Sequence, residues 1–200
     1  MDRLMRASEI IKRPVVTMAG DDIAQIKDIV YGEGGGAVVG FTLAGRGLLA
    51  GPLKQTLPWR SVSALGADAV MIMSEAALGS AEALHSELSA APAVVHGSPR
   101  DVLGSEVLTD DGSALGSVVD VIIEVGDPGR DRCDVVGYEI SASDALGTKG
   151  TRLLIPLPDT LAASGEHLIV PASAKDFVQD DLAGFGAAIE DFRAQLGGTR

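Results

Sequence analysis

The feature that most constrains the fold is an internal repeat: residues 9–30 recur at residues 101–122 with a constant offset of 92. The polar residues that coincide are Thr17 with Thr109, Gly20 with Gly112 and Asp28 with Asp120. Three later apolar blocks also match in the same order, namely 38–41 with 135–138, 57–58 with 155–156 and 70–72 with 168–170. The offset drifts only in segments rich in Gly or Asp, where loops accept insertions at little cost. The pattern predicts a duplication.

Each copy reads as strand, turn, strand. In the second copy Glu106–Thr109 is a short strand, and residues 110–113 supply the Asp-Gly pair that a hairpin turn needs, because Gly adopts positive φ without a Cβ clash. Leu115–Val125 is rich in β-branched residues, as expected for a half-buried strand. Residues 15–31 of the first copy repeat this order.

These residues resemble a known family. The segment 112–121 (GSALGSVVDV), a VVG-aromatic strand at 135–138 and a late proline, Pro156, resemble the PRC-barrel family. That family is named after the H subunit of the photosynthetic reaction centre and also forms the C-terminal domain of a ribosome-maturation factor. Both copies carry the resemblance. The first departs from it at Ala24, where the second has Gly116, which predicts a hairpin of different shape.

The fold class predicted from this resemblance is mainly β: two tandem small PRC-barrel-like β-barrels with a short linker helix and a C-terminal helix. The expected bounds are a first module at 1–74, a linker at 75–97, a second module at 98–181 and a helix at 182–200. A strand is predicted at Gly47–Leu53 and a linker helix at Glu75–Leu88. Apolar residues at spacings of three and four predict a terminal helix over Leu182–Leu196, which packs on the barrel or docks a partner. Two fused copies predict a pseudo-dimer within one chain, and leave open whether the chain also forms a homodimer.

Composition limits the classes of partner. The net charge of −12 disfavours direct binding to nucleic acid and to anionic membrane surfaces. The sequence has no signal-peptide pattern and no run of eighteen apolar residues, so a protein without membrane insertion is expected in the cytoplasm. The single cysteine, Cys133, is expected as a free surface thiol in a loop.

Nothing in the sequence predicts catalysis, a cofactor or a metal site. Gly32–Gly36 precedes a strand, whereas a phosphate loop needs a helix N-terminus. The histidines His85, His96 and His167 lack metal-ligand spacing, and a weak cation site at Asp127, Asp131 and Asp134 is less expected than a solvated loop. The twin Asp28 and Asp120 are interpreted as carboxylates that stabilise a strand end or turn once per copy.

The resemblance implies a non-enzymatic interaction protein, an adaptor that binds another protein and helps assemble a complex, for example from the cytoplasmic side of a membrane complex. The candidate exposed contacts are Trp59, Phe185 and Phe192, although such side chains are more often core than interface. Two alternatives remain open: a ribosome-maturation-type factor that binds a basic ribosomal protein, and a small-molecule or metal sensor.

Overall fold

The structure is a computed structural model that describes residues 3–32, 36–47, 50–84, 102–126, 132–147, 149–157, 162–163 and 166–197. The chain divides into two compact units. The first comprises Met1–Ala93 with Glu124–Asp134, and the second Val94–Ile123 with Val135–Arg200. Both are built mainly of curled β-sheet, which confirms the predicted fold class.

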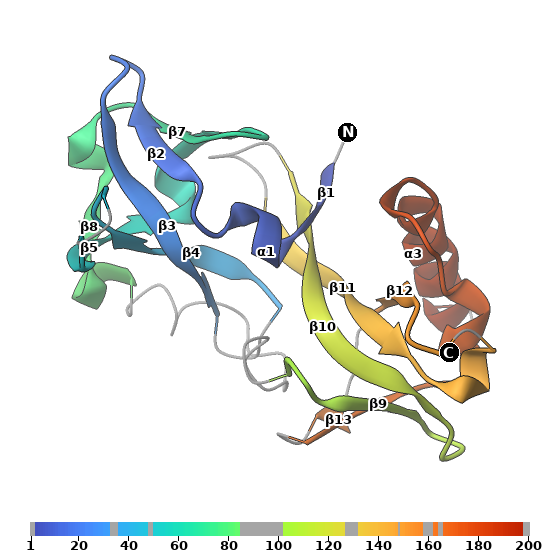
Figure 1. The fold of residues 1–200 in the computed structure, drawn as a ribbon. Coiled ribbons are helices and arrows are strands. Elements are labelled where there is room, and N and C mark those ends of the chain that lie inside the picture. The colour runs from blue at the N-terminus through green and yellow to red at the C-terminus, as the bar shows by residue number, and fades with distance from the viewer. Residues whose placement is uncertain are drawn as a thin grey trace. The chain divides into compact units, whose positions relative to one another are not determined.

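The first unit is a sheet with the strand order β6-β7-β2-β3-β4-β5-β8. The strands of this sheet are β2 (Pro14–Thr17), β3 (Asp22–Tyr31), β4 (Val38–Ala44), β5 (Pro52–Pro58), β6 (Val62–Leu65), β7 (Val70–Ile72) and β8 (Gly79–Ser80). The first strand of the chain, β1 (Arg3–Arg6), lies outside it. The short helices of this unit are α1 (Ala7–Ile10), η1 (Trp59–Ser61) and η2 (Glu75–Ala77). Figure 1 shows β2, β3 and β4 side by side in blue.

The second unit has the strand order β13-β14-β9-β10-β11-β12. Its strands are β9 (Glu106–Thr109), β10 (Ala114–Val125), β11 (Cys133–Ala142), β12 (Arg152–Pro156), β13 (Ala162–Ala163) and β14 (His167–Val170). Its helices are η3 (Asp144–Leu146), η4 (Ala172–Phe177) and α3 (Leu182–Gly197), shown in red in Figure 1. This order matches β6-β7-β2-β3-β4-β5 of the first unit, strand for strand. In each unit, one parallel pair has a described register, and it joins a strand of the first hairpin to a strand near the end of the sheet's sequence: β2 with β7, and β9 with β14.

The hairpin turns of the two units are built from the same hydrogen bonds. The hydroxyl oxygen of Thr17 accepts the N–H of Asp21 at 3.1 Å, and that of Thr109 accepts the N–H of Ser113 at 2.9 Å. The turn glycines have φ of 94° and 88°, which favours glycine at both places. Both hairpins also carry a bulge at the same register, beside the Val15–Ala24 pair in one and the Val107–Gly116 pair in the other. Ala24 thus leaves the register unchanged, but the backbone differs as predicted, because Gly116 has φ of 152° and Ala24 has no positive φ.

The turn before each hairpin is repeated too. The backbone N–H of Lys12 donates to the carbonyl of Ile26 at 2.8 Å, and that of Gly104 to the carbonyl of Val118 at 2.8 Å. Lys12 has φ of 72° and Gly104 has φ of 88°. One backbone conformation is thus held by a lysine in the first unit and by a glycine in the second.

In both units a capped helix follows the last strand of the sheet. The Ser80 hydroxyl accepts the N–H of Ala83 at 3.2 Å, where residues 81–84 are helical, and the Asp181 carboxylate accepts the N–H of Gly184 at 2.7 Å at the start of α3. The C-terminal helix begins at the predicted residue. The linker helix begins later than predicted, because residues 75–77 form η2 and β8 pairs with β5 past the expected boundary at residue 74. Residues 85–88 of that prediction lie outside the described residues.

The helices rest on equivalent glycines. A Cβ added to Gly137 would lie 2.5 Å from the Ile155 oxygen and 2.6 Å from the Phe185 ring. A Cβ on Gly40 would lie 2.5 Å from the Leu57 oxygen and 2.9 Å from the Leu84 side chain. The VVG-aromatic block identified in the sequence therefore marks where a helix side chain approaches the sheet closely.

The two cores occupy matching positions. The innermost side chains of the first unit, all at most 1% exposed, are Val15, Ile26, Phe41, Leu57 and Ile72. Their counterparts at the offsets found in the sequence are Val107, Val118, Tyr138, Ile155 and Val170, all buried. Aliphatic side chains with few aromatics fill both interiors, as small barrels allow.

Two local predictions are corrected. The strand expected at Gly47–Leu53 is instead β5, Pro52–Pro58, which pairs with β4. Cys133 is the first residue of β11 and is only 2% exposed, so it is not a surface thiol. Burial and the neighbouring charge of Asp134 raise the pKa of that thiol far above its usual range, which leaves it unreactive at neutral pH.

Candidate protein-interaction surface

The three aromatic side chains nominated from the sequence lie inside the structure. Trp59 is 7% exposed and makes an edge contact with Phe41, while Phe185 and Phe192 are fully buried. Phe192 packs on Phe177 of η4, with 5.2 Å between ring centroids. The expectation that they are exposed is wrong, and the apolar side of α3 covers its own unit.

Exposed apolar side chains lie instead on the outer side of β2 and β7. Met18 and Met73 are 54% and 68% exposed. The strands run parallel, with Val16 opposite Met71, and the N–H of Met18 donates to the carbonyl of Ile72. The two exposed methionines therefore follow the ends of two neighbouring strands. Because strand side chains alternate, one face holds Pro14, Val16, Met18, Ala69, Met71 and Met73. We call these six residues the methionine face.

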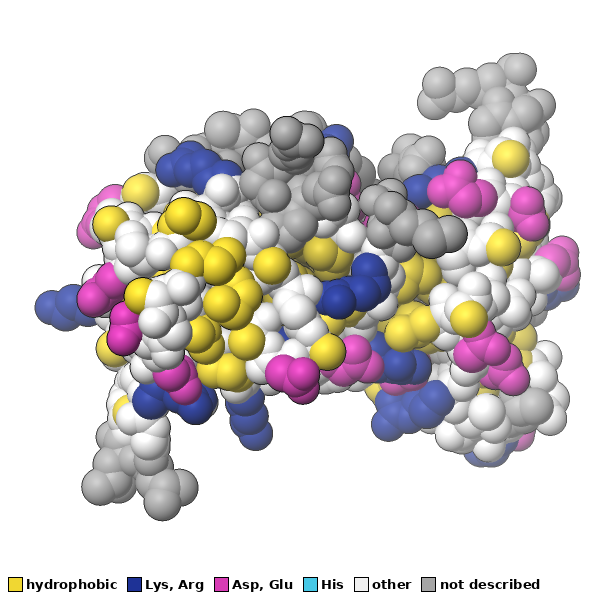
Figure 2. Space-filling view, turned by 90° about the horizontal axis from the view of Figure 1, so that it is seen from above, with side chains coloured by type: hydrophobic (Ala, Val, Ile, Leu, Met, Phe, Trp, Pro, Cys, Tyr) yellow, Lys and Arg dark blue, Asp and Glu magenta, His cyan; other side chains and the backbone are white. Residues whose placement is uncertain are grey.

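The alternate side chains of the same strands form the core. Val15, Thr17, Val70 and Ile72 are all at most 4% exposed. A strand covered on one side normally shows polar residues on the other. Figure 2 shows hydrophobic side chains gathered in an exposed area at the left, on the first unit. An exposed apolar area of this kind marks a contact surface more often than an isolated exposed side chain does.

The matching face of the second unit is interrupted by polar groups. It consists of Glu106, Leu108, Asp110, His167, Ile169 and Pro171, on β9 and β14. Glu106 and His167 approach to 3.7 Å across the parallel strands, where the first unit has Pro14 and Ala69. Asp110 stands where the first unit has Met18, and its carboxylate accepts the N–H of Ala172 at 2.9 Å. Only the apolar centre is common to both faces.

Acidic side chains lie near the exposed methionines in sequence. Asp21 follows Met18 in the hairpin turn, and Glu75 follows Met73 in η2; both are exposed. Asp22 is already paired with Arg46 at 2.8 Å, and Arg60, close to the start of β6, has interactions of its own. Asp21 and Glu75 are thus two exposed carboxylates within three residues of the exposed methionines in the sequence, and that of Asp21 also accepts the Thr17 hydroxyl at 3.3 Å.

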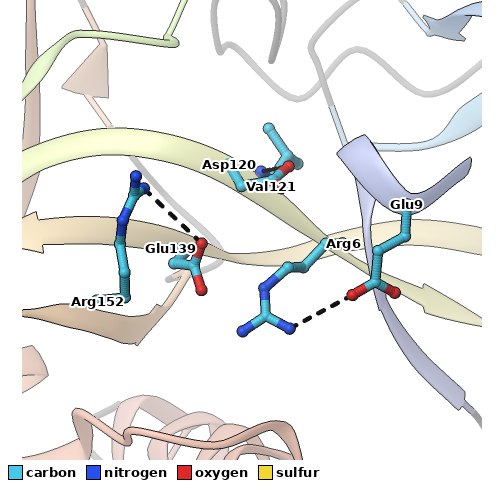
Figure 3. A network of polar contacts seen from close by, with 6 residues as sticks. All are labelled: Arg6, Glu9, Asp120, Val121, Glu139 and Arg152. Atoms are coloured by element: carbon cyan, nitrogen blue, oxygen red, sulfur yellow. Dashed lines mark hydrogen bonds and ion pairs between the residues drawn. The ribbon is translucent and has the colours of Figure 1, made fainter. Parts of the chain in front are cut away.

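The twin aspartates have a structural role, at a different place from the one predicted. Each carboxylate accepts the N–H of the next residue within a long strand: Asp28 from Ile29 at 3.0 Å and Asp120 from Val121 at 2.8 Å. In β3 this residue adjoins a bulge in the pairing with β4. Figure 3 shows the contact at Asp120. The Asp28 carboxylate therefore lies beside a bulge, and both carboxylates bond to the backbone within a strand rather than at a strand end or turn.

Other polar contacts in the described residues are structural pairs. Glu139 of β11, which is nearly buried, lies 3.9 Å from Arg152 of β12, and Arg6 lies 3.5 Å from Glu9; both pairs are drawn in Figure 3. Gly32 donates its N–H to Ala37 at 2.8 Å, which closes the connection between β3 and β4 as a hairpin. No group of three or more potential metal ligands occurs among the described residues. His85, His96, Asp127 and Asp131 lie outside them, while Asp134 pairs with Arg132 at 3.1 Å.

The methionine face was not predicted from the sequence, although the sequence carried a signal. Met18 and Met73 occupy positions that become Asp110 and Pro171 in the other copy. The positions at which the two repeats differ, and not only those at which they agree, therefore mark where an apolar side chain faces outward at the end of a strand.

Within the described residues, no helix is both long enough and apolar enough to cross a membrane.

Part of this chain is similar to a known protein domain. A comparison with curated proteins gives no match. Residues 2–78 match the family model of the PRC-barrel domain. Such domains are in general non-catalytic and mediate protein interactions. A PRC-barrel domain is therefore found in the first unit, where it contains β1 to β7 and the whole methionine face.

Proposed function

We propose that this chain is a non-enzymatic assembly protein that holds another protein against the methionine face. The observation that carries the proposal is the pair of exposed methionines on a PRC-barrel domain, at positions where the second unit has Asp110 and the half-buried Pro171. Methionine suits such a surface because its unbranched, polarisable side chain adapts to different apolar partners.

The proposal treats the second unit as another copy of the same module. Its support is the shared strand order, the repeated hydrogen bonds at Lys12 and Gly104, and the equivalent glycines under the two helices. The second copy gives the adaptor a second scaffold, with a different outer face, on one chain.

The test is capture of partners from native lysate by three forms of the full chain. Met18→Ser with Met73→Ser removes the apolar ends without changing charge. Leu103→Ser is the matched control, because Leu103 is 51% exposed and lies in the second unit. We expect a stoichiometric partner on wild type and on Leu103→Ser, and its loss from the double variant. Equal capture by all three forms would overturn the proposed surface.

A ribosome-maturation role is the second candidate, because a chain of net charge −12 suits a basic ribosomal protein. It predicts that the captured partner is a ribosomal protein and that the chain sediments with a ribosomal subunit. Sedimentation of the chain alone, at the salt concentration at which the partner is retained, contradicts this candidate.

A further inference from the structure

The methionine face has the size of one short helix segment. It spans two strands that lie about 4.8 Å apart, and four residue steps from Pro14 to Met18, which extend about 13 Å. An α-helix is about 10 Å wide and rises 5.4 Å per turn, so about two and a half turns cover this length. Apolar residues at i, i+4 and i+7 of one helix fall on such a strip.

Its edge is acidic where the methionines are most exposed. Asp21 and Glu75 follow the ends of β2 and β7 in the sequence and are exposed, and the Asp21 carboxylate accepts a hydrogen bond from the Thr17 hydroxyl at 3.3 Å. The net charge of the chain, −12 with these two carboxylates included, also attracts cations from a distance. Basic side chains on the partner therefore complement this edge, whereas acidic ones are repelled.

Self-association is the weaker alternative on the same observations. Two copies placed face to face with their strands in the same direction bring Asp21 and Glu75 of each near those of the other, and in either direction each copy carries the same net negative charge. The face thus suits a partner of opposite charge better than a second copy of this chain.

Resting on the proposed function, we propose that the occupant of the methionine face is a basic amphipathic helix of a partner protein. Its apolar side lies along the strip from Pro14 and Ala69 to Met18 and Met73. Its lysines or arginines lie beside Asp21 and Glu75. The exposed methionines supply the apolar contact and the carboxylates fix the orientation of the helix.

The probe is a synthetic 18-residue helix of leucine and lysine, compared with a leucine and glutamate helix of the same apolar pattern. Binding to the full chain is followed by NMR of methionine methyl groups. The chain has five methionines, none of them in the second unit; three belong to the face, and buried Met5 is an internal control. We expect saturable shifts at Met18, Met71 and Met73 with the basic helix only.

Variants separate the apolar and charged contributions. Met18→Ser with Met73→Ser is expected to weaken binding at least about tenfold at any salt concentration, because apolar contact is lost. Asp21→Asn with Glu75→Gln is expected to weaken it about fivefold at low salt and little at high salt, because the edge charges are exposed. Leu103→Ser is expected to leave binding unchanged.

Several outcomes overturn the inference. These are equal binding of the acidic helix, shifts confined to residues outside the face, unchanged affinity in the serine variant, or a dimer in sedimentation that the serine variant abolishes. If the basic helix fails while lysate capture still depends on Met18 and Met73, the proposed function stands and only the partner chemistry falls. If neither depends on them, both fall.

Discussion

The first and second units keep the same strand order and hydrogen bonds, but their outer faces have diverged. Inside, the counterparts of Val15, Ile26, Phe41, Leu57 and Ile72 are again buried. Outside, Met18 corresponds to Asp110, which caps η4, and Met73 corresponds to Pro171. Packing constrains the inner positions of both copies, because any change of volume there is felt. The outer positions carry no such constraint, so one copy can hold an apolar surface that the other lacks.

The largest expected effect is at the pair Gly116 and Ala24. A Cβ on Gly116 would lie 2.3 Å from the backbone oxygen of Ser141, and its φ of 152° strains any L side chain. We expect Gly116→Ala to destabilise the second unit by about 3 kcal/mol, and the reciprocal Ala24→Gly to cost the first unit about 1 kcal/mol. Amide hydrogen exchange of β10, compared with that of β3, measures each cost in its own unit.

The control for this comparison is Gly51→Ala, because a Cβ there meets nothing within 4 Å and no positive φ is involved. That variant is expected to change stability by about 0.5 kcal/mol or less. Equal tolerance of Gly116→Ala and Gly51→Ala would contradict the close approach of β10 and β11 in the second unit.

The next effect is at the glycines under the helices. Gly137→Ala meets a backbone oxygen and the rigid Phe185 ring, so we expect a loss of about 2–3 kcal/mol. Gly40→Ala meets an equivalent oxygen but also the end of the flexible Leu84 side chain, so we expect a loss of about 1–2 kcal/mol. Trp59, the only tryptophan, reports unfolding of the first unit by fluorescence, and hydrogen exchange of α3 reports the second. Stability unchanged by both substitutions would contradict the close approach of the helix side chain and the neighbouring strand to each glycine.

A smaller effect with a change of sign is expected at Lys12 and Gly104. Lys12 is the only non-glycine residue with positive φ in the described part of the chain. Lys12→Gly relieves this strain and is expected to stabilise the first unit by about 1 kcal/mol or less, whereas Gly104→Ala introduces the strain and costs the second unit about 1 kcal/mol. Urea unfolding measures both. Destabilisation by both variants would show that the lysine side chain contributes more than its backbone conformation costs.

The smallest expected effect is a difference in how the two hairpin turns make stability depend on pH. Hydrogen bonds from Thr109 and Ser113 lower the pKa of Asp111 from its usual 3.8, whereas the first unit has Ala19 at that position. A carboxyl group with a lowered folded pKa stabilises the fold above pH 3.8, and this contribution is lost as the pH falls through the folded value. Acidification from about pH 5 to pH 2 should therefore destabilise wild type more than Asp111→Asn. If the stability of the two proteins depends on pH in the same way, the predicted difference between the two turns is wrong.

Much of the fold could be predicted because the repeat exposes what both copies need. The Thr, Gly and Asp matches correspond to the turn and bulge hydrogen bonds, and the spacing of apolar residues in 182–196 gave the start of α3. The β5 strand was misplaced because Pro52 and Pro58 obscured its bounds, and η2 and β8 were hidden in an Ala-rich segment of helical composition. Local propensity is a weak prior where tertiary pairing decides.

The candidate site could be predicted less well. Large aromatic side chains were predicted to contact a partner, but Phe185 lies against Gly137 of the sheet and Phe192 packs on Phe177 of η4. Exposure depends on which side of a strand faces the core, and that was settled only by the register of β2 with β7. The alternation of apolar residues shared by the two repeats therefore predicts the strands, whereas the positions at which the repeats differ locate the methionine face.

The most direct test of the central claim is site-specific photo-cross-linking in cells, with a photoreactive phenylalanine analogue placed at Met73 or at its counterpart Pro171 in otherwise wild-type chains. The two positions occupy the same place on the two units and differ only in the surface around them. The account predicts a discrete cross-linked partner from position 73 and none from position 171. The same partner cross-linked equally from both positions, or from position 171 alone, would contradict the claim that the outer face of the first unit holds the partner.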